Sequence, residues 1–238
     1  MGRSFVRWAM ATAIFWPLLA SAQLTLHYNE RPPYLVRNGG ELSGLVGSLA
    51  ADAFKAAKLP YQLQLTPTAR QLHIIRRNDG QDCALGWFKN SERLAYAKFT
   101  KPIYRDRPMI ALMEATNRKA QKDLTIAEIL KRRDLVLLVK QGYSYGKQLD
   151  ELVARFDPPR VAVSVENLQM LRIILAGRAD YMFVAPEEAD GLISASGIDP
   201  ARLGRLSFSD APNGEWRYIL CSMKVGDEVI ERLNQVIR

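Results

Sequence analysis

The chain has 238 residues, a formal net charge of +8 at pH 7 and two cysteines. This length suits one large domain or two small ones. The lysines and arginines are scattered along the sequence, so we interpret the charge as a solvated surface or a cationic cleft for an anion, and we expect no nucleic-acid partner.

The first 22 residues have the three parts of a secretory signal peptide. Two arginines precede the apolar run WAMATAIFWPLL, and a small-residue A-S-A tripeptide ends at Ala22. The alternative is a membrane anchor, but an anchor needs about 20 apolar residues, and Pro17 interrupts this shorter run. We expect cleavage after Ala22 and a soluble protein without stable membrane insertion, located in the periplasm.

The first half of the remaining chain alternates strands and helices. The hydrophobic pattern predicts strands over 24–28, 61–67 and 83–88, with helices over 44–59 and from 68 or 69 to 77. This β-α-β-α-β order predicts a mainly parallel sheet with helices on both faces.

The second half repeats the pattern. Strands are predicted over 107–114, 135–142, 160–166, 180–186 and 216–223, and helices over 124–134, 145–156, 168–175, 187–197 and 227–238. Thr125 or Asp123 is the expected N-cap of the first of these helices, and Asp227 that of the last. The final strand and helix are left over after two sets, so we expect the chain to return to the first set there.

These elements indicate an α/β protein of two lobes, joined by a hinge, with a ligand cleft between them. We expect a discontinuous first lobe made of residues 23–105 and 214–238, and a second lobe spanning 106–213.

Three segments carry a resemblance to a known family. The stretch GWFKNSERLAYAKFTKPIY places Arg93 before an F-[ST]-x-P-x-Y run, residues 31–54 resemble the family's opening segment, and GRAD at 177–180 matches a G-[RK]-x-D turn. Over nearly all of residues 23–238 the chain thus resembles the extracellular solute-binding proteins of family 3. The resemblance implies a type II periplasmic binding protein fold and a small solute, typically a polar amino acid, delivered to an ABC importer.

The resemblance also implies a set of ligand contacts. Arg93 matches the arginine that clamps the ligand carboxylate, a role that suits the two parallel donors of a guanidinium. Asn90 and Ser91, just before it, match positions that hold the same carboxylate. Further matching candidates in the cleft are Arg31, Tyr34, Trp87, Phe88, Gly142, Tyr143 and Ser144, and Arg70 is added because it begins a helix that can face the cleft. The alternative for each residue is ordinary core, rim or surface packing.

The sequence departs from the amino-acid binders of this family at one position. They carry an aspartate five residues beyond the Asp of the G-[RK]-x-D turn, where it pairs with the ligand ammonium, and here that position is Ala185. A buried ammonium without a partner is costly. Either Glu187 substitutes from one turn away, or the ligand is an organic acid without an α-ammonium.

Cys83 and Cys221 suggest one disulfide in an oxidising compartment, with two buried free thiols as the alternative. The family's topology implies that their strands are neighbours. His27 and His73 have no partners at metal-ligand spacing, so we expect neither a metal nor a cofactor.

The sequence therefore predicts a monomeric solute-binding protein rather than an enzyme, with an ABC transporter permease as a possible partner. Two alternatives stay open. One is a stand-alone sensor that reports a bound solute to a membrane receptor. The other is an enzyme resembling cyclohexadienyl dehydratases, which would need a carboxylic acid in the cleft, with Glu187 or Glu30 as candidates.

Overall fold

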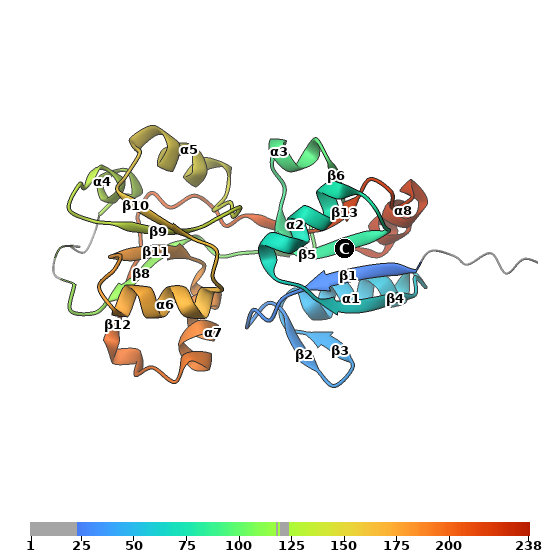
Figure 1. The fold of residues 1–238 in the computed structure, drawn as a ribbon, viewed down its shortest axis with the longest axis horizontal. Helices are drawn as coiled ribbons and strands as arrows, with labels where there is room; N and C mark the ends of the chain where they lie inside the picture. The colour runs from blue at the N-terminus through green and yellow to red at the C-terminus, as the bar shows by residue number, and fades with distance from the viewer. Residues whose placement is uncertain (1–22, 118, 120–123) are drawn as a thin grey trace, which may run out of the picture.

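The computed structural model describes residues 23–117, 119 and 124–238. It consists of two α/β lobes that lie side by side (Figure 1). We call the lobe built on the six-stranded sheet lobe 1, and the lobe built on the five-stranded sheet lobe 2. The expected signal peptide and Asp123 lie outside the described residues. No helix in the described ranges is both long enough and apolar enough to span a bilayer.

The sheet of lobe 1 has the strand order β4-β1-β5-β13-β6, and β7 also pairs with β13. The strands are β1 (Leu24–Tyr28), β4 (Tyr61–Leu65), β5 (Asp82–Phe88), β6 (Ala97–Phe99), β7 (Tyr104–Arg105) and β13 (Trp216–Ser222). β1 is parallel to β4 and β5, whereas β13 is antiparallel to β5, β6 and β7. The chain therefore returns from lobe 2 to place β13 inside the first sheet.

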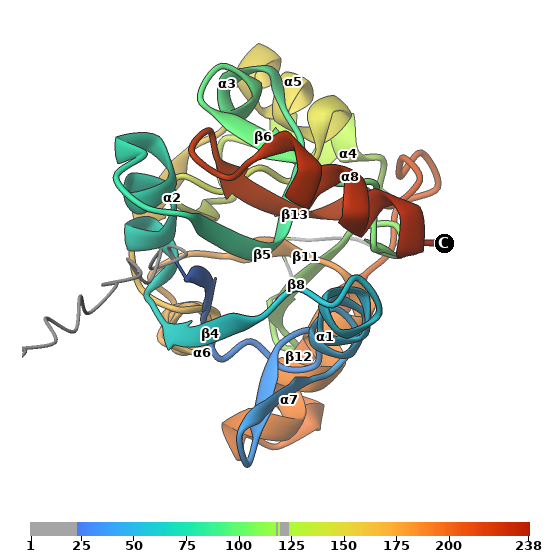
Figure 2. The ribbon, with the colours of Figure 1, turned by 90° about the vertical axis from the view of Figure 1, so that its right-hand side faces the viewer.

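Helices cover both faces of this sheet. On one face α1 (Gly47–Ala56) and α8 (Asp227–Val236) contribute Phe54 and Leu233 to a core with Leu26 of β1. On the other face α2 (Thr68–Arg77) contributes Ile75, which packs with Leu220 of β13. Alternate residues of a strand face opposite sides of its sheet, so β13 supplies both cores. Figure 2 shows α2 on the opposite side of β5 from α1 and α8.

Lobe 2 has the strand order β10-β9-β11-β8-β12. Its strands are β8 (Ile110–Glu114), β9 (Leu137–Lys140), β10 (Arg160–Val163), β11 (Tyr181–Val184) and β12 (Leu203–Leu206). Helices α4 (Ile126–Lys131) and α5 (Lys147–Phe156) cover one face, and α6 (Asn167–Leu175) and α7 (Pro186–Ser196) cover the other. In β11, Phe183 packs toward the first pair and Met182 toward the second.

The predicted α/β class with two lobes is confirmed, and Thr125 is the N-cap of α4 within a capping box. Several short elements were not predicted: the β2 (Val36–Asn38) and β3 (Glu41–Ser43) hairpin, the strands β6, β7 and β12, α3 (Ser91–Leu94) and the 3-10 helix η1 (Pro200–Arg202). The prediction that Asp227 caps the last helix is wrong, because Gly226 is the N-cap and Asp227 is the first helical residue.

The two backbone crossings between the lobes lie against each other. The Asp106 N–H donates to the Glu215 carbonyl at 3.0 Å, and a side chain on Gly214 would place its Cβ 1.7 Å from the Asp106 carbonyl oxygen. Any residue larger than glycine would clash there. Gly214 therefore allows the two crossing segments to lie in direct contact. The boundaries expected at 105/106 and 213/214 fall beside this contact and stay a prediction.

Cys83 and Cys221 form a disulfide, with an S–S distance of 2.05 Å. They lie opposite each other in β5 and β13, and both are fully buried. The bond closes a loop with a sequence separation of 138 residues, which includes all of lobe 2. It therefore fastens the returning strand to the lobe that the chain left more than a hundred residues earlier.

Replacing Cys83 by serine should destabilise the protein by about 2–5 kcal/mol, because a cross-link over a loop this long restricts the unfolded chain strongly. Urea unfolding of the Cys83→Ser variant and of the reduced wild-type protein should give similar losses. Two free thiols in the mass of the non-reduced protein, or an unchanged unfolding midpoint in the variant, would contradict the disulfide.

Candidate ligand-binding site

A cavity lies between the two lobes, at the carboxyl ends of β1 and β5 in lobe 1 and of β9 and β11 in lobe 2. The space free of atoms there is about 780 Å³, which includes a part that is open to solvent. Its polar lining is Asn29, Arg31, Thr68, Arg93, Lys140, Ser144, Asn167, Glu188 and Arg217. Its aromatic and apolar lining is Tyr34, Leu35, Leu85, Gly86, Trp87, Phe88, Met109, Tyr143, Tyr145, Met170, Met182, Phe183 and Val184.

Arg93 reaches from lobe 1 to lobe 2. The short helix α3 begins at Ser91, and the side chain of its N-cap Asn90 accepts a hydrogen bond from the Arg93 backbone N–H. This bond fixes the position of the Arg93 backbone. The guanidinium lies over the Trp87 ring, 4.8 Å from its centroid. It donates to the Phe88 carbonyl at 2.7 Å and to the Gly142 carbonyl of lobe 2 at 2.9 Å. Two of its five N–H groups are thus used.

Arg93 is buried, and no carboxylate of the described residues forms an ion pair with it. Burial lowers the pKa of Arg93 below its usual value, since the charged form loses its hydration. An arginine nevertheless keeps its proton in proteins. Arg93 therefore keeps a full positive charge. Its direct contacts among the described residues are two backbone carbonyls and an aromatic face, while the carboxylates of Glu92 and Asp150 favour its charged form from a longer distance.

Arg31 and Glu188 form an ion pair across the cleft. Arg31 Nε and Nη2 donate to the two carboxylate oxygens of Glu188 at 2.6 and 2.8 Å. Burial alone would raise the pKa of Glu188, but the Arg31 charge outweighs it and holds that pKa below the usual value. Glu188 also accepts from the Asn167 side chain at 2.6 Å. The carboxylate is therefore ionised and occupied on both oxygens.

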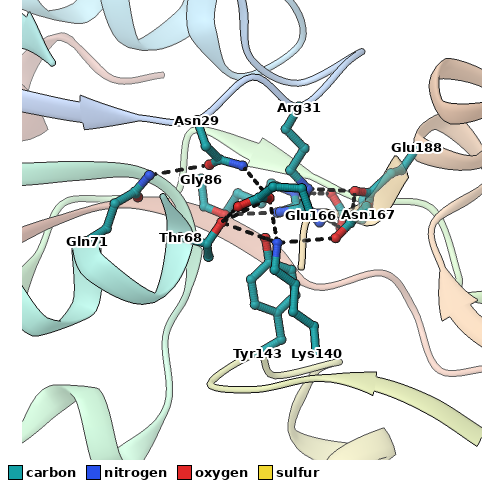
Figure 3. Close-up of polar contacts among 12 residues, drawn as sticks. Asn29, Arg31, Thr68, Gln71, Gly86, Lys140, Tyr143, Glu166, Asn167 and Glu188 are labelled. Atoms are coloured by element: carbon teal, nitrogen blue, oxygen red, sulfur yellow. Dashed lines mark hydrogen bonds and ion pairs between the residues drawn. The ribbon is translucent and has the colours of Figure 1, made fainter. Parts of the chain in front are cut away.

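A second group of polar contacts joins the lobes beside this pair (Figure 3). The Lys140 ammonium, at the end of β9, donates to Glu166 at 2.6 Å. Glu166 also accepts from Asn29 and Thr68 of lobe 1, at 3.3 Å each. Tyr143 lies 4.6 Å from the Lys140 nitrogen, measured to its ring centroid. Lys140 thus has a partner within its own lobe, and Glu166 ties that pair to lobe 1.

Arg217 lies at the floor of the cavity, next to the hinge. Its Nε and Nη2 donate to Asp106 at 2.6 and 2.7 Å, and Nη1 donates to the Gly86 carbonyl at 2.9 Å. Tyr34 covers it, with the guanidinium carbon 3.9 Å from the ring centroid. Because Asp106 belongs to one crossing and Arg217 to the strand that follows the other, this buried pair fixes the base of the hinge.

The cationic side chains of the lining outnumber the carboxylates that contact them directly. These cations are Arg31, Arg93, Lys140 and Arg217. Glu188, Glu166 and Asp106 pair with Arg31, Lys140 and Arg217. Arg93 has no direct carboxylate contact within the described residues, and Glu92 and Asp150 act on it only from a longer distance. Arg93 is therefore the cation of the lining that a solute carboxylate can pair with.

The structure brings together seven of the candidate residues as cavity lining: Arg31, Tyr34, Trp87, Phe88, Arg93, Tyr143 and Ser144. Gly142 contributes its carbonyl to Arg93 but does not line the cavity. Asn90, Ser91 and Arg70 also lie outside the lining; Ser91 and Arg70 are exposed. Their ligand roles stay predictions.

Glu187 lies away from the cavity. Its carboxylate accepts from the backbone N–H and Nε of Arg107, at 3.0 and 2.9 Å, and from the Tyr104 hydroxyl at 3.3 Å. All three contacts lie beside the hinge. The acid that lines the cavity is its neighbour Glu188, and one residue on a helix turns a side chain by about 100°. The local sequence does not show which of Glu187 and Glu188 faces the cavity.

Several lining residues were not predicted, among them Asn29, Thr68, Lys140, Glu188 and Arg217. Asn29, Thr68 and Lys140 stand at or just after the ends of β1, β4 and β9. Because ligand sites in parallel sheets gather at carboxyl ends of strands, that position was a usable signal. Arg217 lies inside β13, and nothing local marks it.

No protein-family model and no curated protein matches this chain, whereas solved structures do. The arginine 3rd transport system periplasmic binding protein from Legionella pneumophila is 14% identical, with a TM-score of 0.72, over 91% of this chain and 92% of that one.

Two other structures agree with it. The arginine-, lysine-, histidine-binding protein ArtJ from Geobacillus stearothermophilus is 14% identical, with a TM-score of 0.71, over 90% of this chain and 89% of its own. Holo ArgBP from T. maritima is 18% identical, with a TM-score of 0.69, over 91% of this chain and 88% of its own. At these identities the likeness shows the fold: this chain has the two-lobed fold of the periplasmic binding proteins.

The Asp106–Arg217 pair gives a stability prediction that does not depend on a ligand. Asp106→Asn and Arg217→Met should each cost about 3–5 kcal/mol, because each leaves a buried charge without its partner. The double variant should lose less than the sum of the two single losses. Urea unfolding of all four proteins measures this coupling. Additive losses, or single losses near zero, would contradict a buried pair at the hinge.

Proposed function

We propose that this chain is a periplasmic solute-binding protein that captures a carboxylated small molecule between its lobes and delivers it to an ABC importer. The observation that carries the proposal is the buried guanidinium of Arg93, which lies in the interlobe cavity without a carboxylate from the described residues. A guanidinium offers a carboxylate two parallel N–H donors. A bound carboxylate would give Arg93 the direct ion pair that the described residues do not supply.

The similar structures support the same class of ligand. They include the substrate-binding protein of an amino acid ABC transporter, an ancestral arginine-binding protein bound to glutamine, and the arginine-, lysine-, histidine-binding protein ArtJ. All of these amino acids carry a carboxylate. We therefore extend to this chain the carboxylate and the transport role, together with the periplasmic location that the first 22 residues predict.

The geometry disfavours the enzyme alternative. A dehydratase needs a protonated carboxylic acid in the cleft. Of the two candidates, Glu187 bonds to Arg107 beside the hinge, and Glu30 is exposed and outside the lining. Glu188 does line the cavity, but Arg31 lowers its pKa and keeps it ionised. Within the described residues no acid of the lining is set up to donate a proton.

The contacts of Arg93 give a direct test of the proposal. A thermal-shift screen of aliphatic, aromatic and dicarboxylic acids and amino acids identifies a ligand, and a ligand at 100 times its Kd stabilises by about 2.7 kcal/mol. Arg93→Ala should then weaken binding of that molecule by about 2–5 kcal/mol. Arg93→Lys should restore part of the affinity, because it keeps the charge and loses the fork.

Calorimetry measures these affinities, and Arg178→Ala serves as the control, since Arg178 is exposed and lies outside the cavity lining. Equal affinity in the wild-type protein and Arg93→Ala would show that Arg93 does not hold the ligand. A screen in which no carboxylate stabilises the protein would contradict the proposed function itself.

A further inference from the structure

The guanidinium of Arg31 sits in a cage formed by both lobes. Its central carbon lies 5.1 Å from the ring centroid of Tyr34 in lobe 1 and 5.1 Å from that of Tyr143 in lobe 2. Glu188 of lobe 2 completes the cage with a two-pronged ion pair, visible in Figure 3. Aromatic faces around a carboxylate form the arrangement with which proteins recognise a free organic cation. Here a side chain of the protein itself occupies it.

The occupied cage leaves no free carboxylate in the described lining for a cationic group of a solute. Both oxygens of Glu188 accept from Arg31, and one also accepts from Asn167. The carboxylates that contact other lining residues are occupied too: Glu166 accepts from Lys140, Asp106 from Arg217 and Asp150 from Ser144. A solute ammonium in the closed cleft would lie next to cations and would displace one of them or stay unpaired. Both outcomes cost free energy.

The remaining lining fits the body of an apolar molecule. Phe88, Met109, Met182 and Phe183 line the same cavity as Arg93. A molecule with one carboxylate and a hydrocarbon tail satisfies both parts: the acid compensates Arg93, and the tail covers the apolar wall. Methionine side chains adapt to tails of different shapes.

We propose that Arg31 is a built-in occupant of the cleft's cation cage and a determinant of its specificity. By filling the cage it selects monocarboxylic acids that lack a basic group, such as 2-oxo acids, over the corresponding amino acids. The inference rests on the proposed function and names the ligand class of the same site. Removing the Arg31 side chain empties the cage and turns it into a site for an organic cation.

Wild-type protein tests the first half of this proposal with matched molecules. The pairs 4-methyl-2-oxopentanoate with leucine, and phenylpyruvate with phenylalanine, share a carbon skeleton and differ in the keto or ammonium group. After bound solute has been removed by unfolding and refolding, calorimetry should show the 2-oxo acid of at least one pair binding about tenfold tighter or more than its amino acid. In no pair should the amino acid be the tighter ligand.

Variants of the cage test the second half. n-Propylguanidine carries one guanidinium and no other charge, so it should raise the Tm of Arg31→Ala and leave the wild-type and Arg178→Ala proteins unchanged. Arg31→Lys keeps a cation in the cage and should not respond. The double variant Arg31→Ala/Glu188→Gln lacks the carboxylate and should lose the response, which separates a cation cage from a merely enlarged cavity.

The outcomes distinguish a failure of the specificity assigned to Arg31 from a failure of the proposed solute-binding function. An amino acid that binds the wild-type protein as tightly as its 2-oxo acid overturns the selection by Arg31 and leaves a solute-binding function standing. The absence of binding by acids and amino acids alike contradicts the proposed function as well. No response to n-propylguanidine in folded Arg31→Ala overturns the cage, and if that variant does not fold, the wild-type pairs still decide the ligand class.

Discussion

The buried charge of Arg93 is the constraint on which the closed arrangement of the two lobes depends. Its guanidinium belongs to lobe 1, donates to the Gly142 carbonyl of lobe 2 and has no carboxylate partner among the described residues. A charge buried in this way is costly unless it is compensated. The lobes can therefore close with little cost around a carboxylate, and at a larger cost around an empty cleft. This difference in free energy is what allows a solute to shift the population toward the closed form.

Other contacts of the fold hold the two lobes in one relative position at the hinge. The two crossings touch at Gly214, and the Asp106–Arg217 pair holds their base in one geometry. The Cys83–Cys221 bond fastens the returning strand inside the first sheet. With the hinge held in this way, the same side chains of the two lobes come into contact across the cleft. The Arg31–Glu188 pair and the contacts of Glu166 depend on this alignment of the lobes.

The sequence predicts the fold class and seven of the residues that line the cavity. Short apolar runs mark β1, β5, β9 and β11, and the family resemblance of the stretch before the FTKPIY run singles out Arg93. The β2–β3 hairpin and β6 are three residues per strand, too short for a periodic signal. The charge pairs could not be read locally, because Arg31 and Glu188 are 157 positions apart and Asp106 and Arg217 are 111 apart. Their partners are determined only once both lobes have folded. For the same reason the local pattern does not distinguish Glu187, which is buried beside the hinge, from Glu188, which lines the cavity.

The account's central claim is that the cleft closes around a carboxylate that compensates Arg93. Calorimetry of the wild-type protein with one carboxylic acid and its primary amide measures this most directly, since the two molecules have nearly the same shape and differ by one negative charge. The account predicts that the acid binds more tightly by about 2 kcal/mol or more, the scale expected for a desolvated charge pair with a guanidinium. Equal affinity for the acid and the amide would contradict it.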